Sequence, residues 1–364
     1  MSQGKPVDRL PEVPRALLVE QRAATLNDLG RYAEALTAVG PQIAANPHDE
    51  GLLVQAAVAL IELDREPEAL GYLRAARAAD PESVRVHKLM SLALRGAGQP
   101  QEAYRAAVHA TRLAPSDPGA HIQVARSACE LNDRTNGLQA ARYAVHLDPT
   151  SAQNHLAVSD VVMPEGRRPS KADLSLAQEH VTRALQLEPG NPVALNEMAR
   201  IQMARGRLVS AAGHLSSSVR SAPGVDVMQR NMDQVLIGLV GRFHWVLFLV
   251  WFAGSRVIVA QHMRPSRWLL VLLGVVGVAV VAVIGRRLQR QVPASMRAGF
   301  VRGFGRRQKL CAAWGGCLLL TSVLFFTAAV APIGWALGLF FAGGVPMAFG
   351  AVLSWVTYLR NRRR

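Results

Sequence analysis

Residues 82–115 read ESVRVHKLMSLALRGAGQPQEAYRAAVHATRLAP, and this stretch contains the pattern that decides the fold. Alanine and leucine recur on both sides of a short Gly-Ala-Gly break, and a proline ends the stretch. Comparable prolines recur at intervals of 34, 34, 34, 40 and 34 residues, at Pro47, Pro81, Pro115, Pro149, Pro189 and Pro223. A pair of helices that must stack on similar neighbours in one register keeps such a count, whereas a solvated loop has no reason to.

Small residues also recur at fixed distances before these prolines. Twelve residues before them stand Ala35, Ala69, Ala103, Gly137, Ala177 and Ala211. Five residues before them stand Ala76, Ala110, Ala144, Ala184 and Ser218, with Gln42 as the departure. Between the two helical halves stand Gly30, Asp64, Gly98, Asn132 and Gly206, all of residue types that tolerate left-handed backbone. The spacing and these positions resemble the tetratricopeptide repeat, which places a small residue where its helices A and B cross.

This resemblance implies an all-α chain whose first part is a superhelix of about six repeats over residues 14–223, after a flexible N-terminus at 1–13. The fifth repeat carries an insertion at 164–172, which is rich in Pro and Arg and is expected to form an exposed loop. The aromatic residue that often begins helix A is replaced throughout, by Val19, Leu53, His87, His121, His155 and Leu195.

The family binds peptides in a groove lined by helix A. The matching positions that we single out here are Arg85, Lys88, Arg95, Gln123, Arg126, Asn196 and Arg200. This excess of basic residues predicts an acidic or C-terminal carboxylate peptide partner, held by charge-assisted hydrogen bonds; an ordinary solvated face is the alternative. A chaperone-type carboxylate clamp is not supported, because Glu20 and Ala24 occupy its first-repeat positions.

The net charge of +15 is confined to one part of the chain. Residues 1–230 hold 25 basic and 25 acidic residues, whereas residues 231–364 hold 16 basic residues and one acidic residue, Asp233. The basic third is also the most apolar, which indicates a membrane rather than nucleic acid. The bias of 37 Arg over 4 Lys is typical of a GC-rich bacterial genome, such as an actinobacterial one.

Long uncharged runs predict four transmembrane helices within residues 243–359, following a capping or juxtamembrane helix at 224–242. Eight Lys or Arg lie in the loop 286–309 and four in the tail 360–364, so both termini are expected in the cytoplasm of a multi-pass cell-membrane protein. The loop should also attract anionic lipid headgroups. The spans are expected at about 243–260, 268–285, 310–331 and 333–358.

Three of these spans contain no Asp, Glu, Lys, Arg or His, which disfavours an ion-coupled transporter. Gly334 and Gly338 form a GxxxG pattern that predicts close helix packing within the chain or between chains, so homo- or hetero-oligomers are possible outcomes.

No catalytic motif occurs, and we expect neither an enzyme nor a cofactor. Cys129, Cys311 and Cys317 are too scattered for a zinc site. His87, His121 and His155 recur every 34 residues, but side chains on stacked helices lie about 10 Å apart, which is too far to share one metal. They are expected to be half-buried helix-surface histidines.

These observations predict a membrane-anchored scaffold whose cytosolic repeats recruit a protein or peptide partner. The alternative is a regulatory or accessory subunit of a membrane channel, transporter or secretion complex. Ionisable residues in the spans or conduction in vesicles would favour the channel or transporter subunit. Capture of a cytosolic partner would favour the scaffold.

Overall fold

The computed structural model describes residues 15–164, 167–221, 230–235 and 237–238, with isolated positions and pairs between 245 and 345. The elements found there are all α-helices, which confirms the expected all-α class for this part of the chain. The helices are α1 (Arg15–Asp28), α2 (Tyr32–Ala45), α3 (Glu50–Ile61), α4 (Glu66–Ala79), α5 (Val84–Gly96), α6 (Pro100–Leu113), α7 (Pro118–Glu130), α8 (Arg134–Leu147), α9 (Ala152–Val162), α10 (Lys171–Leu187), α11 (Pro192–Ala204) and α12 (Leu208–Ser221).

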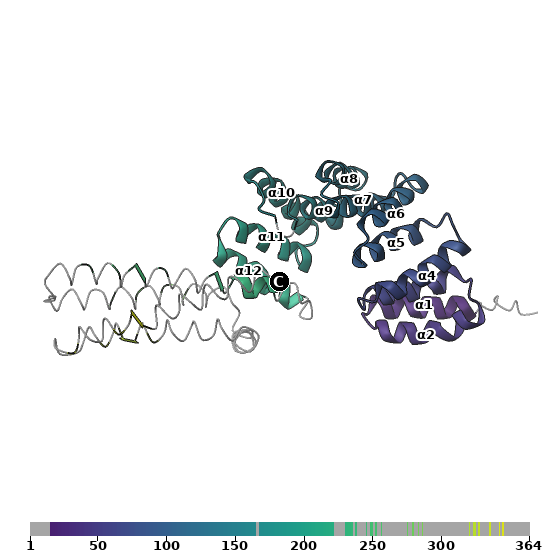
Figure 1. Ribbon diagram of the computed structural model, residues 1–364, viewed down its shortest axis with the longest axis horizontal. Helices are drawn as coiled ribbons and strands as arrows, with labels where there is room; N and C mark the ends of the chain where they lie inside the picture. Colours follow the sequence, from purple (N-terminus) through teal and green to yellow (C-terminus); the bar gives the residue numbers. More distant parts are fainter. Residues whose placement is uncertain are drawn as a thin grey trace, which may run out of the picture. The chain divides into compact units, whose positions relative to one another are not determined.

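Each odd-numbered helix packs against the even-numbered helix that follows it, and the two form a helical hairpin (Figure 1). The small residues expected at the crossings are buried: Ala69, Ala103, Ala177 and Ala211 are each 0% exposed. At Gly137 of α8 an added Cβ would lie 3.1 Å from the carbonyl oxygen of Ala125 on α7. The fourth hairpin therefore has less room at its crossing than the others.

Five of the hairpin turns contain a residue in left-handed conformation, as the residue types indicated. The φ angle is +71° at Gly30, +56° at Asp64, +72° at Gly98, +59° at Asn132 and +72° at Gly206. In all five turns the next backbone N–H donates to a carbonyl five residues earlier, at 2.8 to 2.9 Å. This is the hydrogen bond of the Schellman motif, which ends a helix by satisfying one of its free carbonyls.

The start of most odd-numbered helices is set by a capping residue two positions after each repeat proline. Asp49, Ser83, Asp117, Ser151 and Asn191 each accept a hydrogen bond from a backbone N–H in the first turn of the following helix. Such caps satisfy N–H groups that have no partner inside the helix. The repeat proline and its cap together explain why the 34-residue count is kept.

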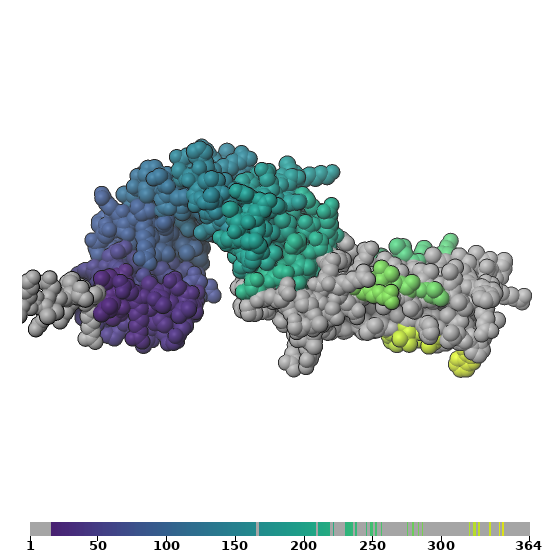
Figure 2. Space-filling view, turned by 180° about the vertical axis from the view of Figure 1, so that it is seen from behind, coloured from purple at the N-terminus to yellow at the C-terminus, as the bar shows by residue number. Residues whose placement is uncertain are grey.

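The chain divides into two compact units, Met1–Leu187 and Glu188–Arg364. The first contains α1 to α10, whose side chains form a continuous surface in sequence order (Figure 2). Its core is a series of clusters between hairpins, in which Leu52, Leu60, Leu73 and Ile122 are at most 2% exposed. The break between the units falls between α10 and α11, upstream of the change in composition near residue 230.

The second unit contains α11 and α12, and residues 230–235 are helical as well. Met232 and Val235 are buried against Ala199 of α11 and Leu215 of α12. The described part of the expected capping segment at 224–242 thus packs on the last hairpin.

No helix among the described residues is both long and apolar enough to cross a bilayer. The four expected spans, about 243–260, 268–285, 310–331 and 333–358, lie outside the described residues except at isolated positions. Gly334, Gly338 and nearly all of the basic loop 286–309 also lie outside them.

Candidate interaction surface

The odd-numbered helices of the first unit form an inner layer. Contacts join α1 to α3, α3 to α5, α5 to α7 and α7 to α9, whereas successive even-numbered helices between α2 and α10 have no comparable contacts. In Figure 1, α7 and α9 lie on one side of the stack and α8 and α10 on the other. Because the closely packed layer lies on the inside of a curved stack, the odd-numbered helices carry the groove positions expected from the sequence.

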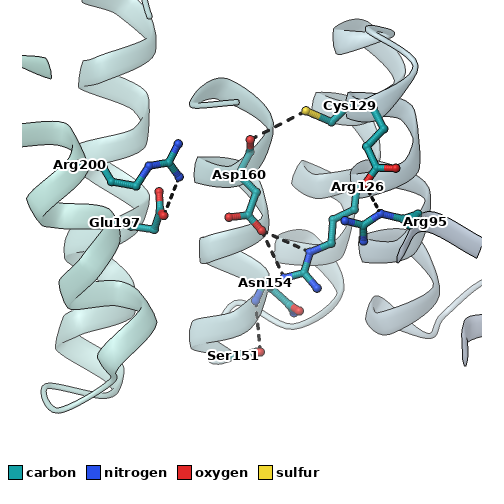
Figure 3. Close-up of polar contacts among 9 residues, drawn as sticks. Arg95, Arg126, Cys129, Ser151, Asn154, Asp160, Glu197 and Arg200 are labelled. Carbon is teal, nitrogen blue, oxygen red and sulfur yellow. Dashed lines mark hydrogen bonds and ion pairs between the residues drawn. The ribbon is translucent and has the colours of Figure 1, made fainter. Parts of the chain in front are cut away.

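Four of the five basic groove residues belong to the first unit, and three of these four form ion pairs with a residue of the next odd-numbered helix or its cap. Lys88 Nζ of α5 lies 2.6 Å from Oδ2 of Asp117, the residue that caps α7. Arg95 Nε of α5 lies 2.7 Å from Oε1 of Glu130, the last residue of α7. Arg126 Nη2 of α7 lies 3.2 Å from Oδ2 of Asp160 on α9, and Figure 3 shows this side chain reaching toward α9.

These pairs correct the expectation of a groove with an excess of basic residues. Asp117 and Glu130 lie at the two ends of α7, outside the positions matched to the family's groove, so the count from the sequence left them out. The side chains of all three pairs remain between 20% and 37% exposed. The inner surface of α5, α7 and α9 is therefore an accessible ladder of alternating charges with little net charge.

The pKa of Asp117 reflects its place in this ladder. Burial raises the pKa of the Asp117 carboxyl, but the Lys88 ammonium and the backbone N–H groups of Gly119 and Ala120 more than offset that effect. The net result is a pKa below the ordinary value, so Asp117 is ionised and serves both as a helix cap and as an ion-pair partner at neutral pH.

Two further expected groove residues differ from the paired cations. Arg85 of α5 is exposed and takes part in none of the ion pairs found among the described residues. Gln123 of α7 is half-buried, and its Oε1 atom is buried without a hydrogen-bond partner in the described structure. Arg85 is thus the expected cation whose charge remains available to a partner.

Neutral side chains join the inner layer in the same way. Asn27 Nδ2 of α1 donates to the Gln55 carbonyl and to Gln55 Oε1 on α3, each at 3.1 Å. The hydroxyls of Ser91 on α5 and Ser127 on α7 lie 3.1 Å apart in the buried layer. Polar contacts between equivalent helices therefore run through most of the first unit.

The remaining expected groove residues belong to the second unit. Arg200 Nη1 donates to Oε1 of Glu197 at 2.8 Å, one turn earlier on α11 (Figure 3). Asn196 Oδ1 accepts a hydrogen bond of 2.8 Å from Asn231 Nδ2. Both side chains thus have partners within their own unit.

The three periodic histidines share a contact that the sequence reasoning missed. Nε2 of His87, His121 and His155 lies 2.9, 2.8 and 3.1 Å from the carbonyl oxygen of the repeat proline six residues earlier. A carbonyl can only accept, so Nε2 carries the hydrogen. The signal was the constant spacing between each histidine and its proline. His121 is half-buried as expected, whereas His87 and His155 are buried.

The described residues contain no group of three or more His, Cys, Asp or Glu side chains placed to hold a metal. Cys129 is half-buried, and burial raises the pKa of its thiol. Its Sγ lies 4.0 Å from the Asp160 carbonyl oxygen (Figure 3). This arrangement favours a neutral, weakly bonded thiol rather than a reactive thiolate.

Stacked helical hairpins with a polar inner layer define a helical-repeat protein. Residues 26–93 match the tetratricopeptide repeat family, and this match spans 68 of the 364 residues. Together with the fold, it supports the tetratricopeptide type of repeat. No curated protein matches the chain significantly.

Among solved structures, a repeat protein with a TM-score above 0.5 shows the same type of fold. A tetratricopeptide repeat protein from Parabacteroides merdae is 13% identical, with a TM-score of 0.53, over 62% of this chain and 86% of that chain. A thermophilic repeat protein from Thermus thermophilus is 21% identical over 52% of this chain and 98% of that one, with a TM-score of 0.45. PilF of Pseudomonas aeruginosa is 16% identical over 59% and 95%, with a TM-score of 0.44.

Proposed function

We propose that this chain is a membrane-anchored interaction scaffold whose helical repeats recruit a protein or peptide partner. Tetratricopeptide repeat proteins are in general non-enzymatic scaffolds, and this supports a binding rather than a catalytic role. The observation that carries the proposal is the exposed polar ladder on α5, α7 and α9. A core needs no such ladder, whereas a docking surface gains specificity from alternating charges.

The ladder restricts the charge pattern that we expect of the partner. Because Lys88, Arg95 and Arg126 already face carboxylates, a partner must match both signs of charge rather than simply be acidic. Its own carboxylate would be held by Arg85, the exposed cation that precedes the ladder on α5. A peptide main chain could also supply the hydrogen bonds that Gln123 Oε1 and Arg95 Nη1 lack, after small rotations of these side chains.

The partner can be tested by photo-crosslinking in cells from position 85, with position 112 on the exposed side of α6 as the control. We expect a discrete crosslinked partner from position 85 that is absent from position 112. In pulldowns, Arg85→Glu should remove this partner, whereas Arg112→Glu, with the same change in charge, should keep it.

A second pair of variants separates binding from folding. Arg126→Glu places two carboxylates opposite each other and should weaken both stability and binding. The exchange Arg126→Glu with Asp160→Arg restores an ion pair and should restore stability. Partner capture that survives Arg85→Glu and is equally strong from both crosslinking positions would reject the inner surface as the docking site.

The membrane part of the proposal rests on the four apolar runs in residues 243–359 and on the arginines that flank them. With both termini in the cytoplasm, the basic loop 286–309 lies beside the inner leaflet and can bind anionic headgroups. A cysteine at position 261 should be labelled by an impermeant maleimide in intact cells, and one at position 295 only after permeabilisation. The opposite pattern would reject this topology, and ion conduction by the purified chain in vesicles would favour a channel subunit.

A further inference from the structure

The outer side of the first unit contains a hollow that the inner docking surface does not use. It has a volume of about 930 Å³ and lies between α6 and α8. Val124 and His121 of α7 line it together with Tyr104 of α6 and residues of α8. The hollow exists because successive even-numbered helices do not pack closely, so the gap between α6 and α8 opens onto α7.

The lining of the hollow is basic. It includes Arg134, Arg142, His121 and His146, and neither Asp nor Glu contributes to it. Arg134 forms a two-point ion pair with Asp173 of α10, and its Nη1 lies 3.2 Å from Oδ2. Arg142 is exposed and takes part in none of the hydrogen bonds or ion pairs found for the described helices. A positive charge is therefore available inside the hollow.

An aromatic side chain is held beside this charge. Tyr143 of α8 is 45% exposed although it is large and mostly apolar. Its ring meets His121 edge-on at 4.6 Å and stacks near His146 at 6.0 Å. His121 is itself held by the Pro115 carbonyl, 2.8 Å from Nε2. Tyr143 is thus oriented before any ligand arrives, and this lowers the entropy cost of binding.

We propose that this hollow is a second docking site, for an acidic peptide segment that carries an apolar side chain beside a carboxylate. The carboxylate pairs with Arg142, and the apolar side chain packs on Tyr143 and His121. The volume lies within the range of ligand pockets, about 300 to 1,000 Å³, and exceeds what one side chain fills. The site belongs to α6, α7 and α8 and is independent of Arg85 on α5.

The probe is a fluorescein-labelled peptide with the core Glu-Phe-Glu, titrated with the full-length chain in mild detergent at low ionic strength. Two matched peptides carry Lys-Phe-Lys and Glu-Gly-Glu. We expect saturable binding of the first peptide, with about tenfold weaker binding of each control, because each control lacks one of the two contacts. Binding should weaken as salt is added.

Arg142→Glu and Tyr143→Ser should each weaken binding of the Glu-Phe-Glu peptide by about tenfold or more. Arg112→Glu on α6 is the matched charge control and should bind the peptide as the unaltered chain does, whereas Arg85→Glu reports separately on any binding to the inner surface. Arg142 and Tyr143 are exposed, so these variants should keep the circular dichroism spectrum and melting temperature.

Several outcomes would overturn the proposal. They are no saturable binding, equal binding of the Lys peptide, or undiminished binding by Arg142→Glu. Equal binding of Glu-Gly-Glu together with displacement by inorganic phosphate would assign the hollow to a small anion instead. If Arg85→Glu loses binding and Arg142→Glu keeps it, the peptide binds to the inner surface instead. Failure of the outer site leaves the inner-surface crosslinking result unaffected.

Discussion

Arg126 on α7 and Asp160 on α9 occupy equivalent helices one repeat apart, and their Nη2 and Oδ2 atoms lie 3.2 Å from each other. A residue that faces a groove in the family's pattern here joins two repeats. Since the side chains are 26% and 33% exposed, the pair is neither a core feature nor a free surface charge. The inner surface thus stabilises the stack and remains accessible to a partner.

The energetic coupling of this pair should be small but measurable. A double-mutant cycle with Arg126→Ala and Asp160→Ala is expected to give a coupling free energy of about 0.5 kcal/mol, in the range of exposed pairs. Urea unfolding of the four proteins provides the measurement. A coupling indistinguishable from zero would show that the contact contributes nothing to the stack, and one that grows with added salt would show that it is not an ion-pair attraction.

The backbone conformations of Gly98 and Gly71 predict opposite effects of substitution by alanine on stability. Gly98→Ala places a Cβ on backbone with φ of +72° and should lower the free energy of unfolding by about 1 to 2 kcal/mol. Gly71 lies on the exposed side of helix α4 with open space around it. Gly71→Ala should therefore raise the free energy of unfolding by about 0.5 to 1 kcal/mol. Thermal unfolding of both variants checks the prediction, and equal effects would be incompatible with it.

The contact between His155 and His180 should make stability depend on pH. Their Nδ1 atoms lie 3.0 Å apart, and His155 Nε2 faces the Pro149 carbonyl. Burial lowers the pKa of His180, and His155 and Arg142 lower it further, against the opposite effect of Glu179. The unfolded chain therefore binds more protons below its histidine pKa of about 6.5, so stability is complete above that pH and falls as pH decreases.

His180→Gln should reduce this pH dependence. Between about pH 7.5 and pH 5 its melting temperature is expected to fall less than that of the unaltered chain, because one group that must charge on unfolding has been removed. His48→Gln, at an exposed turn, is the control and should keep the original slope. An unchanged slope in the His180 variant would exclude this histidine as the source.

Arg134 and Asp173 predict a different, more acidic dependence. The guanidinium of Arg134 is the main cause that holds the pKa of the buried Asp173 carboxyl well below its ordinary value, against the effect of burial. The ionised Asp173 contributes stability above the pKa of about 3.9 that Asp has in the unfolded chain. This contribution is lost as pH falls toward the lower pKa of Asp173 in the folded chain. Arg134→Ala should lower the free energy of unfolding by about 1 to 3 kcal/mol near neutral pH. The difference from the unaltered chain should shrink below about pH 4.

Unfolding at several pH values measures this difference. Arg105→Ala on α6 is a suitable control, because this exposed arginine forms no ion pair among the described helices. A constant difference between Arg134→Ala and the unaltered chain across the acid range would contradict the assigned role of Asp173.

Much of the fold could be predicted because its causes are local. Pro115 ends one helix, Asp117 caps the next two residues later, and Gly98 or Asn132 turns the chain left-handed within a hairpin. Each depends on the backbone preferences of one residue and a few neighbours, so a 34-residue count reveals them. The buried alanines at the crossings follow for the same reason, since their spacing repeats with the hairpin.

The candidate site was harder to predict, because ion pairs join atoms that are distant in the sequence. Whether Lys88 meets Asp117, or Arg95 meets Glu130, depends on how far one hairpin is rotated on the next. No local preference sets that rotation; the packing of whole helix faces does. The order of helices, turns and caps was therefore readable along the chain, whereas the neutralised inner surface and the basic hollow beside Tyr143 arose only when the hairpins stacked, since charge balance depends on distance in space.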